Sequence, residues 1–280
     1  MEYMYEIFGT HRIAAAERYP ALSFLVRFAI MARRDSDKAS KRPVTKLHTK
    51  EAAGQPIRPA EKEPKNMKLL ITGFSPFGGE TLNPAWEAVK LLPDRIGAVH
   101  VVKKELPTVF KKAGLQLWET IRTQRPDAVL CVGQAGGRSG ISIERVAVNL
   151  ADFPIADNEG NQPIDQPVIP DGKNAYFSTL PVNAMVQAIR AHGIPAFLSH
   201  SAGTYVCNDV FYRLLYLAER EFPLMKGGFL HVPYSLEQTV HKPQGTPGMP
   251  ISVISDAIRF AVEALDGEMD GTPVSDGAIC

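Results

Sequence analysis

The chain has 280 residues, of which 45% are hydrophobic and 22% are charged, with 22 glycines and 22 prolines. This length and composition are typical of a globular protein with one medium-sized domain, and they exclude collagen, a coiled coil and a disulfide-stapled mini-protein. The formal net charge of +1 gives no overall field that would attract nucleic acid or an anionic membrane. We therefore expect a small or neutral partner, and neither nucleic acid nor a membrane.

The first 66 residues differ in composition from the rest. They hold 13 Lys and Arg against 8 Asp and Glu, a charge of +5, which leaves −4 for residues 67–280. Residues 33–66 have no aromatic side chain and few large aliphatic ones, too few to offset the entropy that ordering would remove. The sequence predicts an extension over 1–66, either poorly ordered or a non-native start, then a domain over 67–265 and a flexible tail over 266–280.

The cysteines and the apolar stretches favour a cytoplasmic protein. Three widely spaced cysteines, Cys131, Cys207 and Cys280, form neither a disulfide framework nor a zinc site with paired ligands. The most apolar early stretch, residues 20–32, is too short to span a bilayer and lacks a signal-cleavage pattern. We therefore expect no membrane span and no secretion.

From residue 67 to 265, apolar runs of strand length alternate with segments of helical periodicity, which predicts an α/β domain. Several runs are nearly continuous in Val, Ile and Leu, as in strands that are covered on both faces. We therefore expect an open twisted central sheet with helices on both faces. The predicted strands are residues 68–74, 98–106, 128–134, 143–149, 196–201 and 228–232. The predicted helices are residues 109–124, 180–192, 206–221 and 251–265.

Two glycine-rich segments, residues 72–79 and 133–138, follow predicted strands. Neither has the spacing of a phosphate-binding loop, and the first lacks the dinucleotide fingerprint, so we expect no nucleotide cofactor. Phe74 and Phe77 lie on the first segment, in a predicted loop. Large rings on a loop either cover the core or line a pocket.

Cys207 is the candidate nucleophile, because a thiol is the strongest intrinsic nucleophile in this sequence. It is the second residue of a predicted amphipathic helix that begins at Val206. The unpaired N–H groups and the positive end of the helix dipole favour a thiolate there and can bind an oxyanion. The alternative for a cysteine is a buried, inert side chain, and that alternative suits Cys131 in the middle of a predicted strand.

His231 is the candidate base, since a thiol nucleophile needs a group that takes its proton and later protonates the leaving amine. It lies at the carboxyl end of a predicted buried strand, where the sites of open α/β sheets assemble. His200, also at a strand end, is the competing candidate. A purely structural histidine is the alternative for either.

Glu144 is the candidate carboxylate that would orient the imidazole, because it is embedded in the apolar segment 143–148. The alternative is a charge pair between Glu144 and Arg145 on a strand edge. The polar residues 157–160 predict a turn instead.

Five segments together resemble the pyroglutamyl peptidase I family of cysteine peptidases, also called pyrrolidone-carboxylate peptidases. The resemblance runs in order from about residue 67 to 265. It implies an α/β fold with a twisted central sheet, no metal or other cofactor, and a cytoplasmic homotetramer. The segments are ITGFSPFGGE at 71–80, CVGQAGGR at 131–138, ERVAVN at 144–149, SAGTYVCN at 201–208 and HVPY at 231–234.

The resemblance implies an enzyme that removes an N-terminal pyroglutamyl (5-oxoproline) residue from peptides by acyl transfer through a thioester. It assigns Cys207 as the nucleophile, His231 as the base and acid, and Glu144 as the orienting carboxylate. The same three residues were selected above from residue chemistry alone.

The resemblance also implies a pocket for the five-membered lactam. A flat, uncharged lactam fits between aromatic rings with a few hydrogen bonds, whereas an N-terminal glutamine would bring an ammonium group into an apolar slot. The matching positions are the rings of Phe74, Phe77 and Tyr205, with Asn83 and Gln134 as polar contacts.

Two positions depart from the family pattern: Pro154 stands where many members have arginine, and Tyr205 replaces the usual phenylalanine. They leave two alternative functions open. One is a cysteine amidase that acts on another lactam or N-acyl substrate. The other is a catalytically silent module that binds lactam-ended peptides, with Cys207 merely buried.

Overall fold

The structure is a computed structural model that describes residues 66–266 and residue 276. The predictions for residues 1–65 and for most of the C-terminal tail therefore lie outside the described residues. Within the described part of the chain, no helix is long and apolar enough to cross a membrane.

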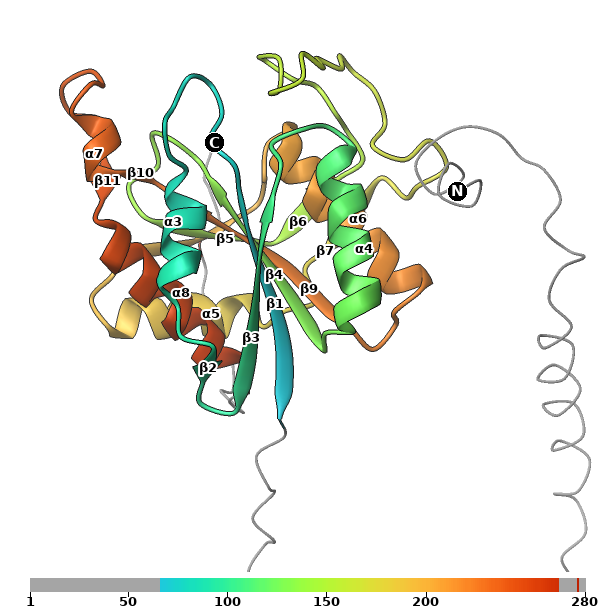
Figure 1. Ribbon diagram of the computed structural model, residues 1–280, viewed down its shortest axis with the longest axis horizontal. Helices are drawn as coiled ribbons and strands as arrows, with labels where there is room; N and C mark the ends of the chain where they lie inside the picture. The colour runs from blue at the N-terminus through green and yellow to red at the C-terminus, as the bar shows by residue number, and fades with distance from the viewer. Residues whose placement is uncertain (1–65, 267–275, 277–280) are drawn as a thin grey trace, which may run out of the picture. The chain divides into compact units, whose positions relative to one another are not determined.

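A seven-stranded mixed sheet forms the centre of the domain (Figure 1). Four of its strands run parallel as β3-β1-β4-β9, β2 is antiparallel to β3, and β5 is antiparallel to β9 but parallel to β8. In sheet order the strands are β2 Arg95–Ile96, β3 Val99–Leu106, β1 Met67–Phe74, β4 Ala128–Gln134, β9 Lys226–Val232, β5 Ile141–Glu144 and β8 Ala196–Ser199.

Helices cover both faces of this sheet, so the predicted α/β architecture is confirmed (Figure 1). One face packs against α3 Pro84–Leu91, α5 Val182–Ala191 and α8 Ile251–Asp266. The other packs against α4 Lys112–Gln124 and α6 Val206–Arg220. Because successive side chains of a strand point to opposite faces, Leu69 of β1 packs in the first core and Leu70 in the second.

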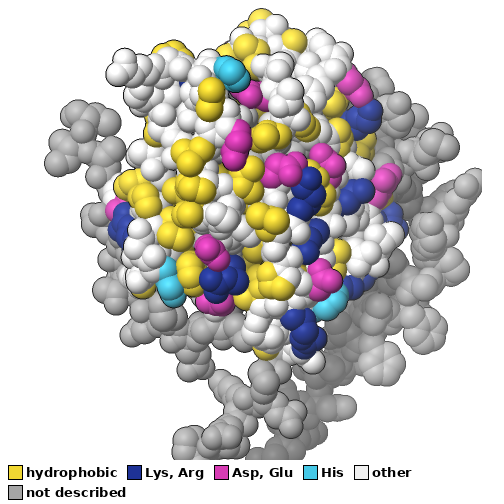
Figure 2. Space-filling model, turned by 60° about the vertical axis from the view of Figure 1, so that its left-hand side comes forward, with side chains coloured by type: hydrophobic (Ala, Val, Ile, Leu, Met, Phe, Trp, Pro, Cys, Tyr) yellow, Lys and Arg dark blue, Asp and Glu magenta, His cyan; other side chains and the backbone are white. Residues whose placement is uncertain are grey.

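Small elements complete the domain. They are the antiparallel pair β6 Val146–Val148 and β7 Ala175–Phe177, the parallel pair β10 Tyr234–Ser235 and β11 Gly248–Met249, and the short helix α7 Leu236–Thr239. Figure 2 shows one face of the molecule, on which acidic, basic and apolar side chains are intermixed. This face shows no broad field of one sign, in keeping with the balanced composition.

Besides the short elements β2, β7, β10, β11 and α7, which were not predicted, the structure differs from the predicted elements most clearly in three places. The predicted strand 143–149 is two strands, because the chain leaves the central sheet at Arg145 and β6 pairs with β7 instead. The helix predicted from 109 begins at Lys112, after Lys111 adopts a left-handed φ of 61°. Helix α3 was not predicted because it is only eight residues long; it begins with an Asn83 cap and Pro84, both favourable at a helix start.

Candidate active site

A cavity of about 460 Å³ opens at the edge of the sheet where β1, β4 and β9 end. Seven of the eight predicted site residues line it. The eighth, Glu144, is not in the lining but forms a hydrogen bond with His231. The lining residues are Phe74, Phe77, Asn83, Thr108, Gln134, Ala135, Gly136, Arg138, Pro154, Ile155, Ala202, Gly203, Tyr205, Cys207 and His231.

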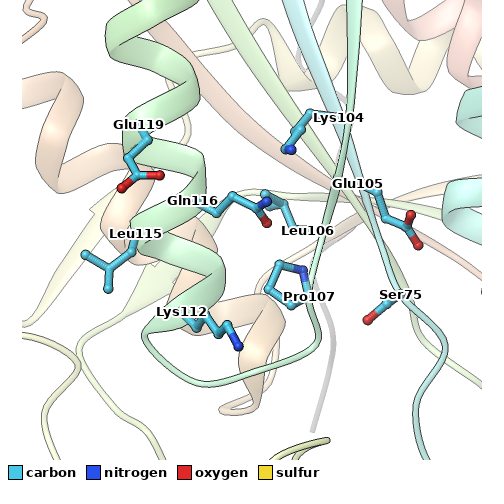
Figure 3. Close-up of a pocket in the computed structure, with 9 residues that line it drawn as sticks. All are labelled: Ser75, Lys104, Glu105, Leu106, Pro107, Lys112, Leu115, Gln116 and Glu119. Carbon is cyan, nitrogen blue, oxygen red and sulfur yellow. The ribbon is translucent and has the colours of Figure 1, made fainter.

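A larger hollow of about 730 Å³ lies between β3 and α4 (Figure 3). Its walls are Ser75, Lys104, Glu105, Leu106, Pro107, Lys112, Leu115, Gln116 and Glu119. These side chains include no thiol and no imidazole, and none of the predicted site residues is among them. The smaller cavity is therefore the candidate active site.

Cys207 is the second residue of α6, and its Sγ lies against β4. A Cβ atom at Gly133 would lie 2.8 Å from this sulfur and 2.9 Å from Cζ of Phe229. The glycine therefore leaves the space that the thiol occupies. Gly133 is also the register partner of His231 on β9. Because paired residues of neighbouring strands project to the same face, thiol and imidazole lie on the same face of the sheet.

The pKa of the Cys207 thiol is raised to about 12, chiefly by desolvation and to a lesser extent by the negative charge of Glu144, against the lowering effect of Arg138. The thiol therefore holds its proton more firmly than a free cysteine does. This differs from the thiolate that a helix N-terminus predicts, because desolvation outweighs the field of the helix end. His231 is the imidazole that lines the same cavity as this thiol.

His231 is 3% exposed, and its Nδ1 lies 2.8 Å from Oε1 of Glu144. An ionised carboxylate only accepts hydrogen bonds, so Nδ1 carries a hydrogen and Nε2 is left to act as a base. The ring of Phe229 packs against the imidazole at 4.8 Å between centroids. His200, the competing candidate, is exposed and does not line the cavity.

Glu144 ends β5 and is fully buried. Burial raises its pKa, but the hydrogen bond and charge of His231 and the charge of Arg138 outweigh this effect, so the pKa lies below its usual value. Its ion-pair partners are His231 and Arg138. Arg145 instead donates to Asn183 Oδ1 at 3.3 Å, so the alternative of a charge pair between Glu144 and Arg145 is wrong.

The aromatic residues predicted to hold the lactam all line the cavity, in different settings. Phe74 is the last residue of β1 and not part of a loop, and at 2% exposure it also packs in the core. Phe77 lies in the following loop, with its ring 6.0 Å from that of Tyr205. The Tyr205 hydroxyl donates to the carbonyl of Ala156 at 3.2 Å, so it braces the wall of the cavity.

The two residues predicted as polar contacts, Asn83 and Gln134, also line the cavity, but both already form hydrogen bonds with other residues. Asn83 caps α3: its Oδ1 accepts from the N–H of Ala85 at 3.1 Å, and its Nδ2 donates to the Ser75 carbonyl at 3.2 Å. Oε1 of Gln134 accepts from Nε2 of Gln238 at 3.2 Å. Their amides are therefore held in fixed orientations, which suits a site that must recognise a small rigid ring.

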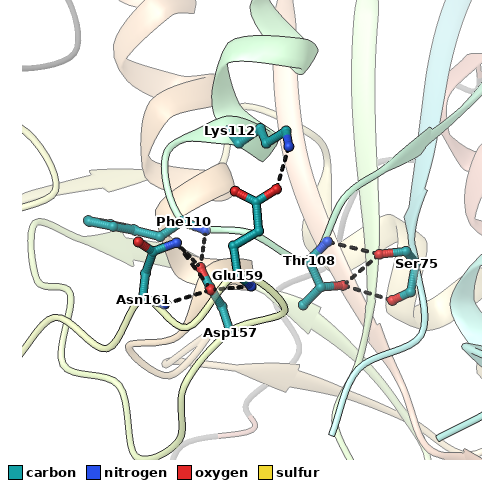
Figure 4. A network of polar contacts seen from close by, with 7 residues as sticks. All are labelled: Ser75, Thr108, Phe110, Lys112, Asp157, Glu159 and Asn161. Atoms are coloured by element: carbon teal, nitrogen blue, oxygen red, sulfur yellow. Dashed lines mark hydrogen bonds and ion pairs between the residues drawn. The ribbon is translucent and has the colours of Figure 1, made fainter. Parts of the chain in front are cut away.

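Three loops that wall the cavity are tied together by hydrogen bonds, most of them drawn in Figure 4. Thr108 Oγ1 donates to the Ser75 carbonyl at 2.7 Å. The Asp157 carboxylate accepts from the N–H groups of Phe110, Glu159 and Asn161 at 2.7–2.9 Å. The predicted turn at 157–160 is thus present, and it also anchors the 107–111 loop.

Several lining residues were not identified from the sequence, and Arg138 is the most consequential. Its Nη1 donates to Glu144 Oε1 at 2.6 Å. The sequence signal for Arg138 was its position: a charged residue directly after two glycines that follow a predicted buried strand. Thr108 and Ile155 carried no such signal, because they reach the cavity only through long loops, whereas Pro154, which the sequence marked only as a departure from the family pattern, also lines the cavity. Within residues 66–266 and 276, no group of three or more His, Cys, Asp and Glu could hold a metal ion.

Comparisons with known proteins show which family the chain resembles. The family model described as pyroglutamyl peptidase matches residues 67–268. Pyrrolidone-carboxylate peptidase 1 of Streptococcus pneumoniae serotype 4 is 56% identical over 199 residues, which are 71% of this chain and 92% of that protein. The pyrrolidone-carboxylate peptidase of Thermosipho melanesiensis is 52% identical over 202 residues, 72% of this chain and all of that protein.

Among solved structures, the crystal structure of Bacillus amyloliquefaciens pyroglutamyl peptidase I superposes with a TM-score of 0.69 at 45% sequence identity. The match covers 71% of this chain and 97% of that one. Family model, relatives and structure all match the part of the chain that carries the cavity. The chain therefore belongs to the pyroglutamyl peptidase family of hydrolases.

Proposed function

We propose that this chain removes an N-terminal pyroglutamyl residue from peptides, with Cys207 as nucleophile, His231 as base and acid, and Glu144 as orienting carboxylate. The observation that carries the proposal is the buried 2.8 Å hydrogen bond from His231 to Glu144, in a cavity that also contains the Cys207 thiol. The names of the relatives supply the substrate class.

In the first step, the proton of Cys207 passes to Nε2 of His231, and Sγ attacks the carbonyl carbon of the pyroglutamyl residue. The N-terminal N–H groups of α6 have no partner within their helix and face the developing oxyanion. The C–N bond then breaks, and His231 gives its proton to the leaving amine. A pyroglutamyl thioester on Cys207 and a free peptide amine result.

In the second step, a water molecule attacks the thioester carbonyl while His231 takes one of its protons. The C–S bond breaks, pyroglutamate leaves, and the proton returns to the sulfur. Throughout, Glu144 holds the Nδ1 hydrogen and stabilises the imidazolium that forms after each proton transfer. The reaction therefore consumes one water molecule for each peptide that is cleaved.

The cavity supports selection of a lactam because its walls are aromatic and held in place. Phe74, Phe77 and Tyr205 offer ring faces, and a flat ring gains most from such contacts. A charged N-terminal ammonium in the same place would lose its hydration without a carboxylate facing it. We therefore expect strong rejection of substrates that begin with glutamine.

A substrate panel tests the proposal. Fluorogenic amides of pyroglutamate, proline, glutamine and acetyl-alanine are offered to the purified chain, with Cys207→Ala as the matched control. Turnover of the pyroglutamyl amide by the parent alone supports the proposed function. Preference for the acetyl-alanyl amide would establish the amidase alternative, and binding without turnover would establish the silent module.

The domain limits, assembly and location remain expectations. The family resemblance supports a catalytic domain over 67–265 that assembles as a cytoplasmic homotetramer. Light scattering on the purified chain measures the assembly directly. A monomeric mass at the concentration of the activity assay would contradict the tetramer.

A further inference from the structure

Arg138 enters the site through a tight glycine turn after β4. A Cβ atom at Gly136 would lie 2.1 Å from Cζ of Tyr234, so the turn packs directly on that ring. Gly137 has a φ of +87°, which glycine adopts without strain. This geometry directs the Arg138 side chain to Glu144 and to the Ser201 carbonyl, which accepts from Nη2 at 3.2 Å.

The charge of Glu144 has opposite effects on the two reacting groups. It stabilises an imidazolium at His231, but it also raises the pKa of the Cys207 thiol. A thiolate and a carboxylate on either side of one imidazolium would leave a net negative charge in a largely buried site. Such a charge is unfavourable unless a partner neutralises it.

Arg138 supplies that partner without blocking His231. Its guanidinium and the imidazole both donate to Oε1 of Glu144, at 2.6 and 2.8 Å. With Arg138 present, Cys207, His231, Glu144 and Arg138 together carry no net charge. This holds for a thiol beside a neutral imidazole and equally for a thiolate beside an imidazolium. Among the described residues that line the cavity, Arg138 is the only Lys or Arg.

We propose that Arg138 is a positioning residue that offsets the charge of Glu144 at Cys207 and so permits the thiolate–imidazolium pair to form. The inference rests on the proposed function, in which Cys207 is the nucleophile. The bond to Ser201 adds a second effect. Through Arg138, it connects the loop that leads into α6 to Glu144, which also binds His231. The nucleophile and its base are therefore positioned by the same carboxylate.

The other groups around the thiol do not supply this charge. Glu144 faces His231 from β9, Arg138 from the glycine turn and Ser199 from β8. Cys207 faces Glu144, Arg138 and the thiol of Cys131 on β4. Burial raises the pKa of Cys131 to about 12, so that thiol stays neutral. Tyr205 likewise has its pKa raised to about 12, chiefly by burial.

The test is the pH dependence of iodoacetamide alkylation at Cys207, measured by peptide mapping because the chain has three cysteines. Arg138→Gln should displace the profile to higher pH by about one unit, the lower end of the effect of a nearby cation. At a fixed pH below the midpoint, alkylation is then roughly 10-fold slower. Arg138→Lys, which keeps the charge, should restore most of the parent profile. Arg145→Gln removes a neighbouring cation that does not line the cavity and should leave the profile unchanged.

A parent-like profile for Arg138→Gln, or equal displacement of the Gln and Lys variants, would overturn the inference. Circular dichroism checks the fold of each variant, and Arg138→Met serves as a second neutral variant if the Gln variant does not fold. Alkylation needs no substrate. A displaced profile in a chain that cleaves no pyroglutamyl amide would refute the proposed function alone.

Discussion

Adding one methyl group at Gly133 tests the placement of the nucleophile. In Gly133→Ala, the new Cβ would lie 2.8 Å from Sγ of Cys207 and 2.9 Å from Cζ of Phe229, where ordinary contacts begin near 3.4 Å. The sulfur or the strand must therefore move by roughly 0.6 Å. Misplacement by about 1 Å lowers rates about 100-fold, so kcat/KM should fall by roughly 10- to 100-fold. Overpacking of this kind also destabilises a core by about 1–3 kcal/mol.

The matched control is Gly227→Ala on β9. Its Cβ would meet Leu214 at 3.0–3.2 Å and Leu215 at 3.3 Å, and neither side chain lines the cavity. This variant should lose stability without losing rate. The assay measures kcat/KM on the pyroglutamyl amide well below each melting temperature, with calorimetry for stability. If folded Gly133→Ala keeps the parental kcat/KM, the sulfur does not act from the position next to β4.

Three further predictions concern the carboxylates and the extension. Glu144→Gln keeps the shape of the site but loses the charge that stabilises an imidazolium at His231. Steady-state kinetics should show that kcat falls about 100-fold or more, and circular dichroism should show an intact fold. Asp157→Asn should raise KM more than it lowers kcat, because it loosens the loops around the cavity. The folded-state pKa of Asp157 is lowered. Denaturation across pH should therefore show a parental stability advantage above about pH 4 that is lost as the pH falls. A chain that begins at Met67 should keep full activity, and a large loss would show that residues 1–66 contribute to the domain.

The fold was predictable from the sequence where a strand is buried on both faces. Strand β4 has the bounds that its apolar run predicts, residues 128–134. Strand β5 has only four residues and runs antiparallel to β9. Its separation from β6 depends on the pairing of β6 with β7, which no local pattern specifies. A short helix such as α3 depends on one polar cap, so periodicity over eight residues could not identify it.

The candidate site was predictable where single residues carry chemistry. Cys207 and His231 stand out by residue type at the ends of predicted elements, and Glu144 stands out as a carboxylate in an apolar segment. The structure places Cys207 and His231 in one cavity and joins Glu144 to His231 by a hydrogen bond. The electrostatics were not predictable, because they come from tertiary contacts. The setting of the thiol depends on how α6 packs against Gly133 of β4, and the bond from Arg138 to Glu144 depends on how the glycine turn packs against Tyr234.

The central claim is that Cys207 becomes acylated by the pyroglutamyl group. The most direct measurement is rapid acid quenching of the chain during turnover of a pyroglutamyl ester, followed by intact mass and peptide mapping. The account predicts one pyroglutamyl group per chain, bound to Cys207, released by hydroxylamine and absent from Cys207→Ala. Turnover by the Ala variant, or an acyl group on another residue, would contradict it.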